Sequence, residues 1–303
     1  MLADGVESYV ALRRACGFGF KSQAKIITSF AAFSDAKGKH YVSTETAVEW
    51  ARSARSRLRR ARLLGEVIRF ARHIHAEDPR HEIPPPVFGS EKHDRPVPFI
   101  FSRDDLQRLL HEASDFGRDP FRGHTYRTFF GLLACTGLRV SEALRLRFDD
   151  ITADGLVIRR SKFQKSRLIP LHPTTQKALE DYLQIRRPYA PFDDHVFVST
   201  ARRPLLILSP EVVFRTIVKK IGLPRGPGLP RPTIHSLRHT FAVRALENCP
   251  DGRDRIRQHM LALSTYLGHS EITYTYWYLE ATPDLMKNIA TVCENHFSGG
   301  SRR

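Results

Sequence analysis

Several side chains spread along the sequence are of the types that catalyse reactions at a phosphate group. Two arginines can clamp the non-bridging oxygens of a pentacoordinate phosphorane, on which negative charge builds up. A lysine can donate a proton to a departing alkoxide, and a tyrosine hydroxyl can attack once a histidine or a cationic site favours its phenolate. The residues that could do this are Arg139, Lys162, His235, Arg238 and His269, followed by Tyr274, Tyr276 and Tyr278 at alternate positions. We expect their four segments to meet around one phosphate.

Each of these residues alone has an ordinary structural explanation. Arg139 follows a glycine at the end of an apolar stretch, and Lys162 lies in a basic turn, so either could be a solvated surface residue. Glu142, however, falls three residues after Arg139 on the same helical face and could hold its guanidinium in place. His235 and Arg238 are also three residues apart on a predicted helix, so they point the same way. The combination favours one site.

The charge of the chain predicts a polyanionic partner. Its 303 residues carry a formal net charge of +16 at pH 7, which favours nucleic acid over an acidic membrane surface or a merely basic protein. No run approaches the ~18 apolar residues of a membrane span, and MLADGVESYV does not resemble a signal peptide. We therefore expect a cytoplasmic, nucleoid-associated protein. The widely spaced Cys16, Cys135, Cys249 and Cys293 are predicted to be buried free thiols.

The sequence predicts chemistry without a metal ion or a nucleotide. His239 follows His235 by four positions, but no third ligand follows at a spacing that would complete a zinc site. Neither a carboxylate cluster suited to magnesium nor a P-loop is found. A phosphotyrosine bond conserves the energy of the phosphodiester that it replaces, so strand exchange through it needs no ATP. We expect no cofactor.

Residues 1–80 are predicted to form a small helical domain, with breaks at 17–19 and 37–39 and a fourth helix over 57–75. A run of arginines spans the third and fourth helices, and the two nearby glutamates cannot pair with all of them. The arginines are Arg52, Arg55, Arg57, Arg59, Arg60 and Arg62. They could be a solvated helix face, but in so basic a chain we interpret them as a DNA-binding surface that follows phosphates.

A triple proline within residues 81–99 predicts an extended interdomain linker before a larger domain over 100–303. Ser102, followed by acidic residues, is a predicted helix N-cap. Two strands of this domain flank a basic turn that carries Lys162 and Lys165. The predicted helices lie near 126–136, 138–145, 173–186, 209–221, 234–248, 253–265, 270–278 and 283–297, and the predicted strands at 155–158, 167–171 and 195–198.

Four segments together resemble the motifs of the tyrosine recombinase, or phage-integrase, family. They are ACTGLRVSEALRLRFDDI, SKFQKSRLIPLH, HSLRHTFA and YLGHSEITYTYWYLEA, in the family's order and within roughly residues 100–290. The helical domain before them is more loosely similar to the family's core-binding, SAM-like domain. The resemblance implies a mainly α fold with a small β-sheet, in which a mixed α/β catalytic domain follows the core-binding domain.

The resemblance also implies roles for the matching residues. Arg139 and Arg238 match the catalytic arginines, and Glu142 matches the acidic residue that supports the first of them. Lys162 matches the lysine of the family's β-hairpin, which is the general acid for the 5′-hydroxyl. Lys165 lies in the same turn and is its rival for that role.

The histidines and the nucleophile follow from the same motifs. His235 matches the first residue of the family's His-x-x-Arg pair, and His269 matches the histidine that hydrogen-bonds the scissile phosphate. The family's nucleophile lies nine residues after that histidine, which selects Tyr278. Tyr274 and Tyr276 are the rivals, and are otherwise interpreted as packing or DNA-contact aromatics.

The implied activity is site-specific cleavage and rejoining of double-stranded DNA through a 3′-phosphotyrosine, for a mobile element. Synapsis implies a homotetramer, with accessory recombinases or DNA-bending proteins as further partners. A type IB topoisomerase-like enzyme and a non-catalytic DNA-binding factor are the alternatives. The polar segment 246–266 is longer than in much of the family, which bears on the subfamily. Residues 283–303 could dock on a neighbouring subunit or close their own domain.

Overall fold

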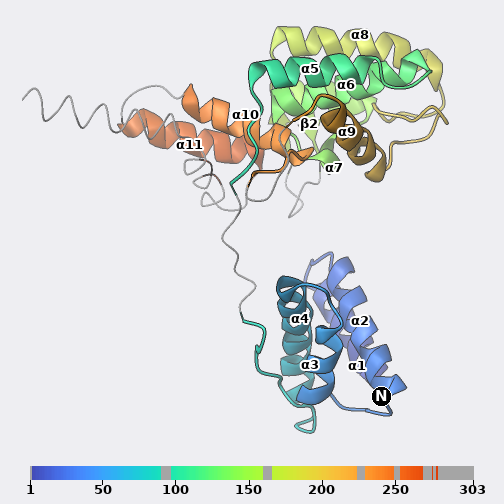
Figure 1. Cartoon of the computed structure of the whole chain (residues 1–303), viewed down its shortest axis with the longest axis vertical. Coiled ribbons are helices and arrows are strands. Elements are labelled where there is room, and N and C mark those ends of the chain that lie inside the picture. Colours follow the sequence, from blue (N-terminus) through green and yellow to red (C-terminus); the bar gives the residue numbers. More distant parts are fainter. Residues whose placement is uncertain are drawn as a thin grey trace, which may run out of the picture. The chain divides into compact units, whose positions relative to one another are not determined.

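The computed structural model of the chain describes residues 2–89, 97–159, 166–223, 229–248 and 253–268, together with Thr275 and Tyr278. The chain divides into two compact units, Met1–Arg95 and Pro96–Arg303 (Figure 1). Each unit has its own hydrophobic core. The prediction of a mainly helical chain with a small β-sheet is confirmed. In the part of the chain that the structure describes, no helix is both long enough and apolar enough to cross a membrane.

The N-terminal unit is built from helices that begin and end where local signals place them. They are α1 (Leu2–Ala15), α2 (Lys21–Ala36), α3 (Thr44–Arg52) and α4 (Arg57–His75). Ser43 and Ser56 cap α3 and α4, because each side chain accepts a hydrogen bond from the backbone N–H three residues later. The buried faces meet around Ile27, Phe30 and Phe70, which are 0 % exposed. The bounds of α4 are those predicted from the sequence.

The chain beyond α4 folds back on the same unit. The Glu82 carboxylate accepts a hydrogen bond from the backbone N–H of Thr44 at 2.7 Å, and the Glu82 N–H donates to the Val42 carbonyl at 2.8 Å. Further along, the Arg57 Nε donates to the carbonyl of Phe88 at 3.2 Å. The stretch up to residue 89, triple proline included, therefore rests against the helices.

The C-terminal unit is mostly helical, with one small antiparallel sheet in the order β1-β2-β3. Its helices are α5 (Arg103–Ser114), α6 (Pro120–Thr136), α7 (Val140–Ala143), α8 (Pro173–Tyr189), α9 (Leu208–Lys220), α10 (His235–Glu247) and α11 (Arg253–Leu267), with the 3-10 turn η1 (Phe148–Asp150). The strands are β1 (Ile151–Thr152), β2 (Gly155–Ile158) and β3 (Arg167–Ile169). In the register, Leu156 of β2 faces Ile151 on one side and Ile169 on the other. The capping box at Ser102 confirms the predicted start of α5.

Three of the predicted elements differ from the structure. Helix α6 begins at Pro120 rather than near residue 126, because the Asp119 side chain accepts from a backbone N–H of the first turn and proline suits the first helical position. The predicted helix 138–145 shortens to the single turn α7. The predicted strand 195–198 is wrong, since the backbone there forms isolated bridges from His195 to Arg147 and from Val198 to Pro204.

The predicted burial of the cysteines is also corrected where it can be compared. Cys16 and Cys135 are free thiols and both are exposed. Cys16 follows the last residue of α1, and Cys135 lies in the last turn of α6. Cys249 and Cys293 lie outside the described residues, as do the predicted helices 270–278 and 283–297 apart from Thr275 and Tyr278.

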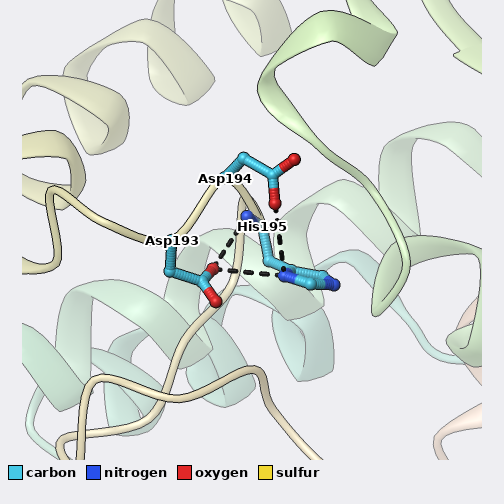
Figure 2. Close-up of side chains that lie close together, drawn as sticks. All are labelled: Asp193, Asp194 and His195. Atoms are coloured by element: carbon cyan, nitrogen blue, oxygen red, sulfur yellow. Dashed lines mark hydrogen bonds and ion pairs between the residues drawn. The ribbon is translucent and has the colours of Figure 1, made fainter.

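A buried arginine shapes the loop that follows α8. Arg186 is 0 % exposed, and its guanidinium donates to the carbonyls of Ala190 at 2.9 Å and His195 at 2.6 Å. The Asp193 carboxylate accepts from Arg186 at 3.2 Å and from the backbone N–H of His195 at 2.8 Å. Figure 2 shows how Asp193 and Asp194 then gather around the His195 side chain. These bonds hold the loop in place of a strand.

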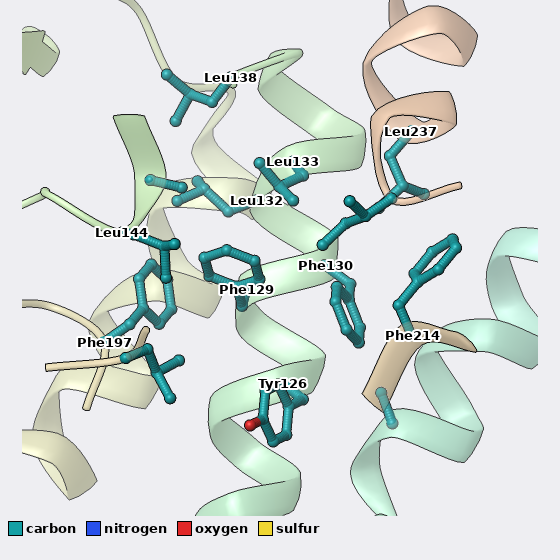
Figure 3. Packing of buried hydrophobic residues seen from close by; sticks show 14 of the residues in the cluster. Tyr126, Phe129, Phe130, Leu132, Leu133, Leu138, Leu144, Phe197, Phe214 and Leu237 are labelled. Atoms are coloured by element: carbon teal, nitrogen blue, oxygen red, sulfur yellow. The ribbon is translucent and has the colours of Figure 1, made fainter. Parts of the chain in front are cut away.

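Helix α6 runs through the core of the C-terminal unit. In Figure 3, Phe129 points toward Phe197 and Phe130 points toward Phe214, with ring centroids 5.0 and 5.6 Å apart. All four rings are at most 1 % exposed. Burying one such side chain contributes roughly 1.5–3 kcal/mol. The packing therefore anchors α6, and with it Gly137, where the candidate site begins.

Candidate active site

The turn after α6 sets the position of Arg139. Gly137 has a backbone φ of 60°, a left-handed conformation that glycine adopts with little strain. The chain then restarts as α7, with Arg139 at its N-cap. The backbone N–H of Arg139 donates to the Glu142 carboxylate at 2.9 Å, and its guanidinium donates to the same carboxylate at 2.8 Å. The predicted contact between these two residues is present.

Glu142 lies between two guanidiniums and is 4 % exposed. Besides Arg139, Arg167 donates to both carboxylate oxygens, from Nη1 at 3.0 Å and from Nη2 at 2.9 Å. Burial alone would raise the pKa of Glu142, but hydrogen bonds from Arg167 and Arg139 and their positive charges lower it to about 2. The carboxylate is therefore ionised at neutral pH and can orient both arginines.

Three arginines from three different elements hold the C-terminal end of α11. The last carbonyls of a helix lack intrahelical partners and carry the negative end of the helix dipole. Each arginine donates to one of three successive carbonyls: Arg167 to Tyr266, Arg238 to Leu267 and Arg139 to Gly268, each at 2.8 Å. Two of the predicted catalytic arginines are thus bound to adjacent peptide groups, although the sequence separates them by about a hundred residues.

Arg238, on α10, is 2 % exposed. Its guanidinium also donates to the carbonyl of Gly137 at 2.6 Å, which joins α10 to the turn after α6. Burial and the positive charge of Arg139 lower the pKa of Arg238 to about 10, although Tyr278 and Glu142 act in the opposite direction. A lowered arginine pKa means that the surroundings do not fully replace the hydration that the buried guanidinium has lost. The site therefore favours an added anion.

His235 is the first residue of α10 and stays uncharged at neutral pH. The residue keeps an exposed surface. Even so, loss of water around the imidazole and the charges of Arg238 and Arg139 lower its pKa to about 4. A neutral imidazole beside two guanidiniums can hydrogen-bond a phosphate oxygen without adding charge to the site. Its ring centroid lies 4.5 Å from that of His239.

Tyr278 is helical and 3 % exposed, and packs in a small apolar cluster with residues of α10 and α11 that include Leu267. Its hydroxyl oxygen lies 3.3 Å from Nδ1 of His239, and the two rings are 5.5 Å apart. Its electrostatic influence reaches Arg238. The structure therefore brings the predicted nucleophile against α10, the helix that carries His235 and Arg238.

Some predicted site residues cannot be placed, and two contacts were missed. Lys162, Lys165, His269, Tyr274 and Tyr276 lie outside the described residues. The role of Arg167 had a signal in the sequence, because it shares one face of β3 with the buried Ile169, and a charge on a buried face indicates a partner. For His239, the sequence suggested only a metal-binding pair with His235. No neighbouring residue indicates its contact with Tyr278.

The arginines predicted to bind DNA lie at the turn between α3 and α4. Five of them are exposed: Arg52, Arg55, Arg57, Arg59 and Arg62, here called the α3–α4 basic surface. Arg60 is half-buried, and its Nε donates to the carbonyl of Ala54 at 2.8 Å, so it also braces the turn.

Asp193, Asp194 and His195 lie close enough together to hold a metal ion. Their carboxylates already have partners, however, because Asp193 pairs with the buried Arg186 and Asp194 pairs with Arg147 at 2.5 Å (Figure 2 shows the acidic pair around His195). These ion pairs explain the cluster as part of the loop structure.

Comparison with known proteins gives a consistent result. Residues 100–284 match the phage integrase family. The chain is 36 % identical to a Sinorhizobium fredii protein whose name describes it as an integrase/recombinase, over 94 % of each chain. It is 29 % identical to tyrosine recombinase XerC of Pseudomonas syringae pv. tomato, over 80 % of this chain and 75 % of the relative.

Among solved structures, a lambda integrase dimer bound to a COC′ core site shares the fold, with a TM-score of 0.66 and 16 % identity. That comparison covers 93 % of this chain and 96 % of the other. The family match spans more than half of the sequence and includes every segment that forms the site. The chain belongs to the phage integrase family, the tyrosine recombinases.

Proposed function

We propose that the chain is a site-specific DNA recombinase that cleaves and rejoins DNA through a 3′-phosphotyrosine on Tyr278. One observation carries the proposal. Arg139 and Arg238 are bound to adjacent carbonyls at one helix end, while His239, next to Arg238 on α10, contacts the Tyr278 hydroxyl. These contacts support a site in which Arg139 and Arg238 bind the phosphate and Tyr278 attacks it, close to the ends of α10 and α11.

In the first transesterification, the Tyr278 oxygen forms a bond to phosphorus and the bond from phosphorus to the 5′-oxygen breaks. The phenolic proton passes to His239, whose Nδ1 is within hydrogen-bond distance. Lys162 donates a proton to the departing 5′-oxygen, the role that the family resemblance implies for it. In the second step the 5′-hydroxyl of a partner strand gives its proton to Lys162 and its oxygen bonds to phosphorus. The bond from phosphorus to the Tyr278 oxygen breaks, and His239 returns the proton to Tyr278.

The arginines stabilise the negative charge that builds up on the phosphorane within each of these two steps. Arg139 and Arg238 face the non-bridging oxygens of the phosphorane, and the lowered pKa of Arg238 supports a site that gains from binding an anion. His235 and His269 hydrogen-bond the same oxygens. Because Tyr278 is 3 % exposed, its hydroxyl must become accessible to the phosphate before it can attack.

The N-terminal unit supplies DNA contacts outside the catalytic site. We assign residues 1–80 to a core-binding domain, 81–99 to the linker and 100–303 to the catalytic domain. The α3–α4 basic surface and Arg60 contact phosphates of the duplex, and Lys165 contacts it from the β2–β3 turn. The net charge of +16 supports this assignment.

Synapsis of two DNA sites brings four copies of the chain together, with accessory recombinases or DNA-bending proteins as further partners. The proposed role of the recombinase is to move a mobile element. The name integrase/recombinase of the Sinorhizobium fredii relative and the likeness to lambda integrase support this role. A type IB topoisomerase-like activity would instead relax a supercoiled plasmid that lacks any partner site.

The test is covalent capture of the protein on a nicked suicide duplex. The DNA sequence of this duplex is selected from a randomised library by its binding to the full-length protein. Wild-type protein is expected to form an adduct that survives denaturation, and Tyr278→Phe is expected to form none while binding the same DNA. Tyr274→Phe and Tyr276→Phe are the matched controls and should form the adduct.

Two results would contradict the proposal. An adduct with Tyr278→Phe, together with its loss in Tyr274→Phe or Tyr276→Phe, would assign the nucleophile to another tyrosine. The absence of an adduct from the wild-type chain on DNA that it binds tightly would contradict the recombinase activity itself.

A further inference from the structure

Arg167 lies on the β-hairpin side of the site and reaches inward from its strand. It is the first residue of β3, paired with Ile158 of β2, and its side chain is 9 % exposed. In the sequence, the strand begins five residues after Lys162. A nearly buried guanidinium at this position must find partners, because an unpaired buried charge is costly.

Its partners come from two other elements of the catalytic unit. Nη1 and Nη2 donate to the two oxygens of Glu142 at 3.0 and 2.9 Å, a two-pronged contact with α7. Nε donates to the carbonyl of Tyr266 at 2.8 Å, at the end of α11. Only an arginine offers three planar donors in this arrangement, whereas a lysine ammonium is a single point of contact.

The backbone of α11 leaves room for this guanidinium by using a glycine. A Cβ added at Gly268 would lie 2.9 Å from Nη1 and 3.0 Å from Cζ of Arg167. The backbone φ of Gly268 is 66°, so the glycine also allows the chain to turn there. Arg167 therefore packs directly against the residue whose carbonyl accepts the bond from Arg139.

The charges show what Arg167 does for Arg139. Glu142 is shared, since its Oε1 accepts from Arg139 at 2.8 Å and from Arg167 at 3.0 Å. With Arg167 present, the hairpin holds the Glu142 carboxylate on one side. The negative charge of Glu142 then attracts two cations, Arg139 and Arg167, instead of one. Without Arg167, the full negative charge would act on Arg139 alone and could draw its guanidinium out of place.

We propose that Arg167 is a positioning residue for DNA cleavage: it locks the β2–β3 hairpin, Glu142 and the end of α11 together, which keeps Arg139 aligned on the scissile phosphate. This rests on the recombinase function proposed above. Arg167 itself touches neither the phosphate nor Tyr278 in this role. It acts through Glu142 and through the carbonyls that precede His269.

The test compares Arg167→Lys and Arg167→Met with the wild-type chain in single-turnover cleavage of the suicide duplex. We expect the rate constant at saturating DNA to fall roughly 10- to 100-fold, since a misplacement of ~1 Å can cost ~100-fold. Non-covalent DNA affinity should change less than about threefold, in keeping with a residue that does not bind DNA. Thermal unfolding of each variant shows that it is folded.

A double-mutant cycle with Glu142→Gln separates positioning from general stabilisation. If Arg167 acts through Glu142, adding Arg167→Met to Glu142→Gln should slow cleavage much less than it slows the wild-type chain. Arg147→Lys is the matched control, because Arg147 pairs with Asp194 elsewhere in the same unit. This variant should cleave the duplex at the wild-type rate.

The outcomes separate this inference from the proposed function. Wild-type-like rates for both Arg167 variants, or fully additive losses in the cycle, would overturn the positioning role. A loss of affinity with an unchanged saturated rate would also overturn it, by making Arg167 a binding residue. If wild-type protein forms no adduct, the claim that fails is the recombinase function on which this role depends.

Discussion

Arg238 shows how a single buried residue can be held in position within the candidate site. It is 2 % exposed and has its guanidinium on the carbonyls of Gly137 and Leu267, so it is fixed before any phosphate arrives. Preorganised donors of this kind need no reorganisation when charge develops, which is why they stabilise a transition state well. The neutral His235 beside it adds no further repulsion between cations.

The contact between His239 and Tyr278 leads to a prediction about proton transfer. His239→Ala should lower the single-turnover cleavage rate by roughly 100-fold or more, in the range typical of a lost general base. His239→Asn places an amide near the position of Nδ1 but cannot accept the proton, so it should be about as slow as the alanine variant. Cleavage of the suicide duplex at saturating DNA measures both.

His259→Gln is the control for that experiment. His259 lies on α11, is half-buried and contacts the Ala245 carbonyl, rather than a tyrosine hydroxyl, through Nε2 at 2.7 Å. It should leave the rate unchanged. Near-normal cleavage by His239→Asn would show that the histidine only orients the hydroxyl, and near-normal cleavage by His239→Ala would remove it from the reaction.

At the scale of elements, the site depends on how short segments are tied to longer helices. The single turn α7 cannot be stable by itself, because a lone helical turn is costly to nucleate. Glu142 joins it to β3 through Arg167, and Arg139 joins it to the end of α11. The same contacts that align the catalytic groups therefore also stabilise the elements that carry them.

This linkage predicts how stability depends on pH. The pKa of Glu142 is lowered from 4.5 to about 2, so its contribution is fully present above pH ~4.5 and is lost as the pH falls toward 2. The difference corresponds to roughly 3 kcal/mol. His235, whose pKa is lowered from 6.5 to about 4, weakens the fold as the pH falls below ~6.5, because there the unfolded chain binds the proton more readily than the folded chain.

Urea unfolding between pH 7 and pH 3 measures both contributions. Wild-type protein should lose stability in two stages, through the range of His235 and then through that of Glu142. Glu142→Gln should be less stable than wild type at pH 7, and the difference should shrink as the pH approaches 3. A constant difference across the range would mean that Glu142 does not owe its effect to ionisation.

At the scale of the whole molecule, the residues proposed for chemistry and those proposed for DNA attachment fall in different units. The described parts of the proposed reactive centre lie in the C-terminal unit, and the α3–α4 basic surface lies in the N-terminal unit. Charges on an exposed surface raise affinity by releasing counterions from DNA, so they respond to salt more than to sequence.

Removing charges from that surface should change the salt dependence of DNA binding. Arg55→Gln and Arg59→Gln should each reduce the slope of log affinity against log salt by about 0.9, if each arginine contacts one phosphate. Fluorescence anisotropy over a salt series measures the slope. Arg80→Gln is the control, because this exposed arginine of the same unit pairs with Asp78. Unchanged slopes in the first two variants would place the DNA contacts elsewhere.

The sequence by itself determined the features that depend on neighbouring residues. Apolar spacing predicts α4 over 57–75, and Ser102, followed by acidic residues, marks the start of α5. The resemblance to the family's motifs also predicts that Arg139, His235, Arg238 and Tyr278 act as one set. These signals are local, since caps and helical faces are set within a few residues.

Only the tertiary structure decided which groups touch. The carbonyls at the end of α11 receive arginines that lie 29 to 129 residues away in the sequence, and Tyr278 meets His239 across 39 residues. No local pattern specifies such pairs, because they depend on how α10, α11 and β3 pack. The role of His239 becomes visible only there, and so do the partners of Arg167, since a buried guanidinium is defined by the partners that folding brings to it.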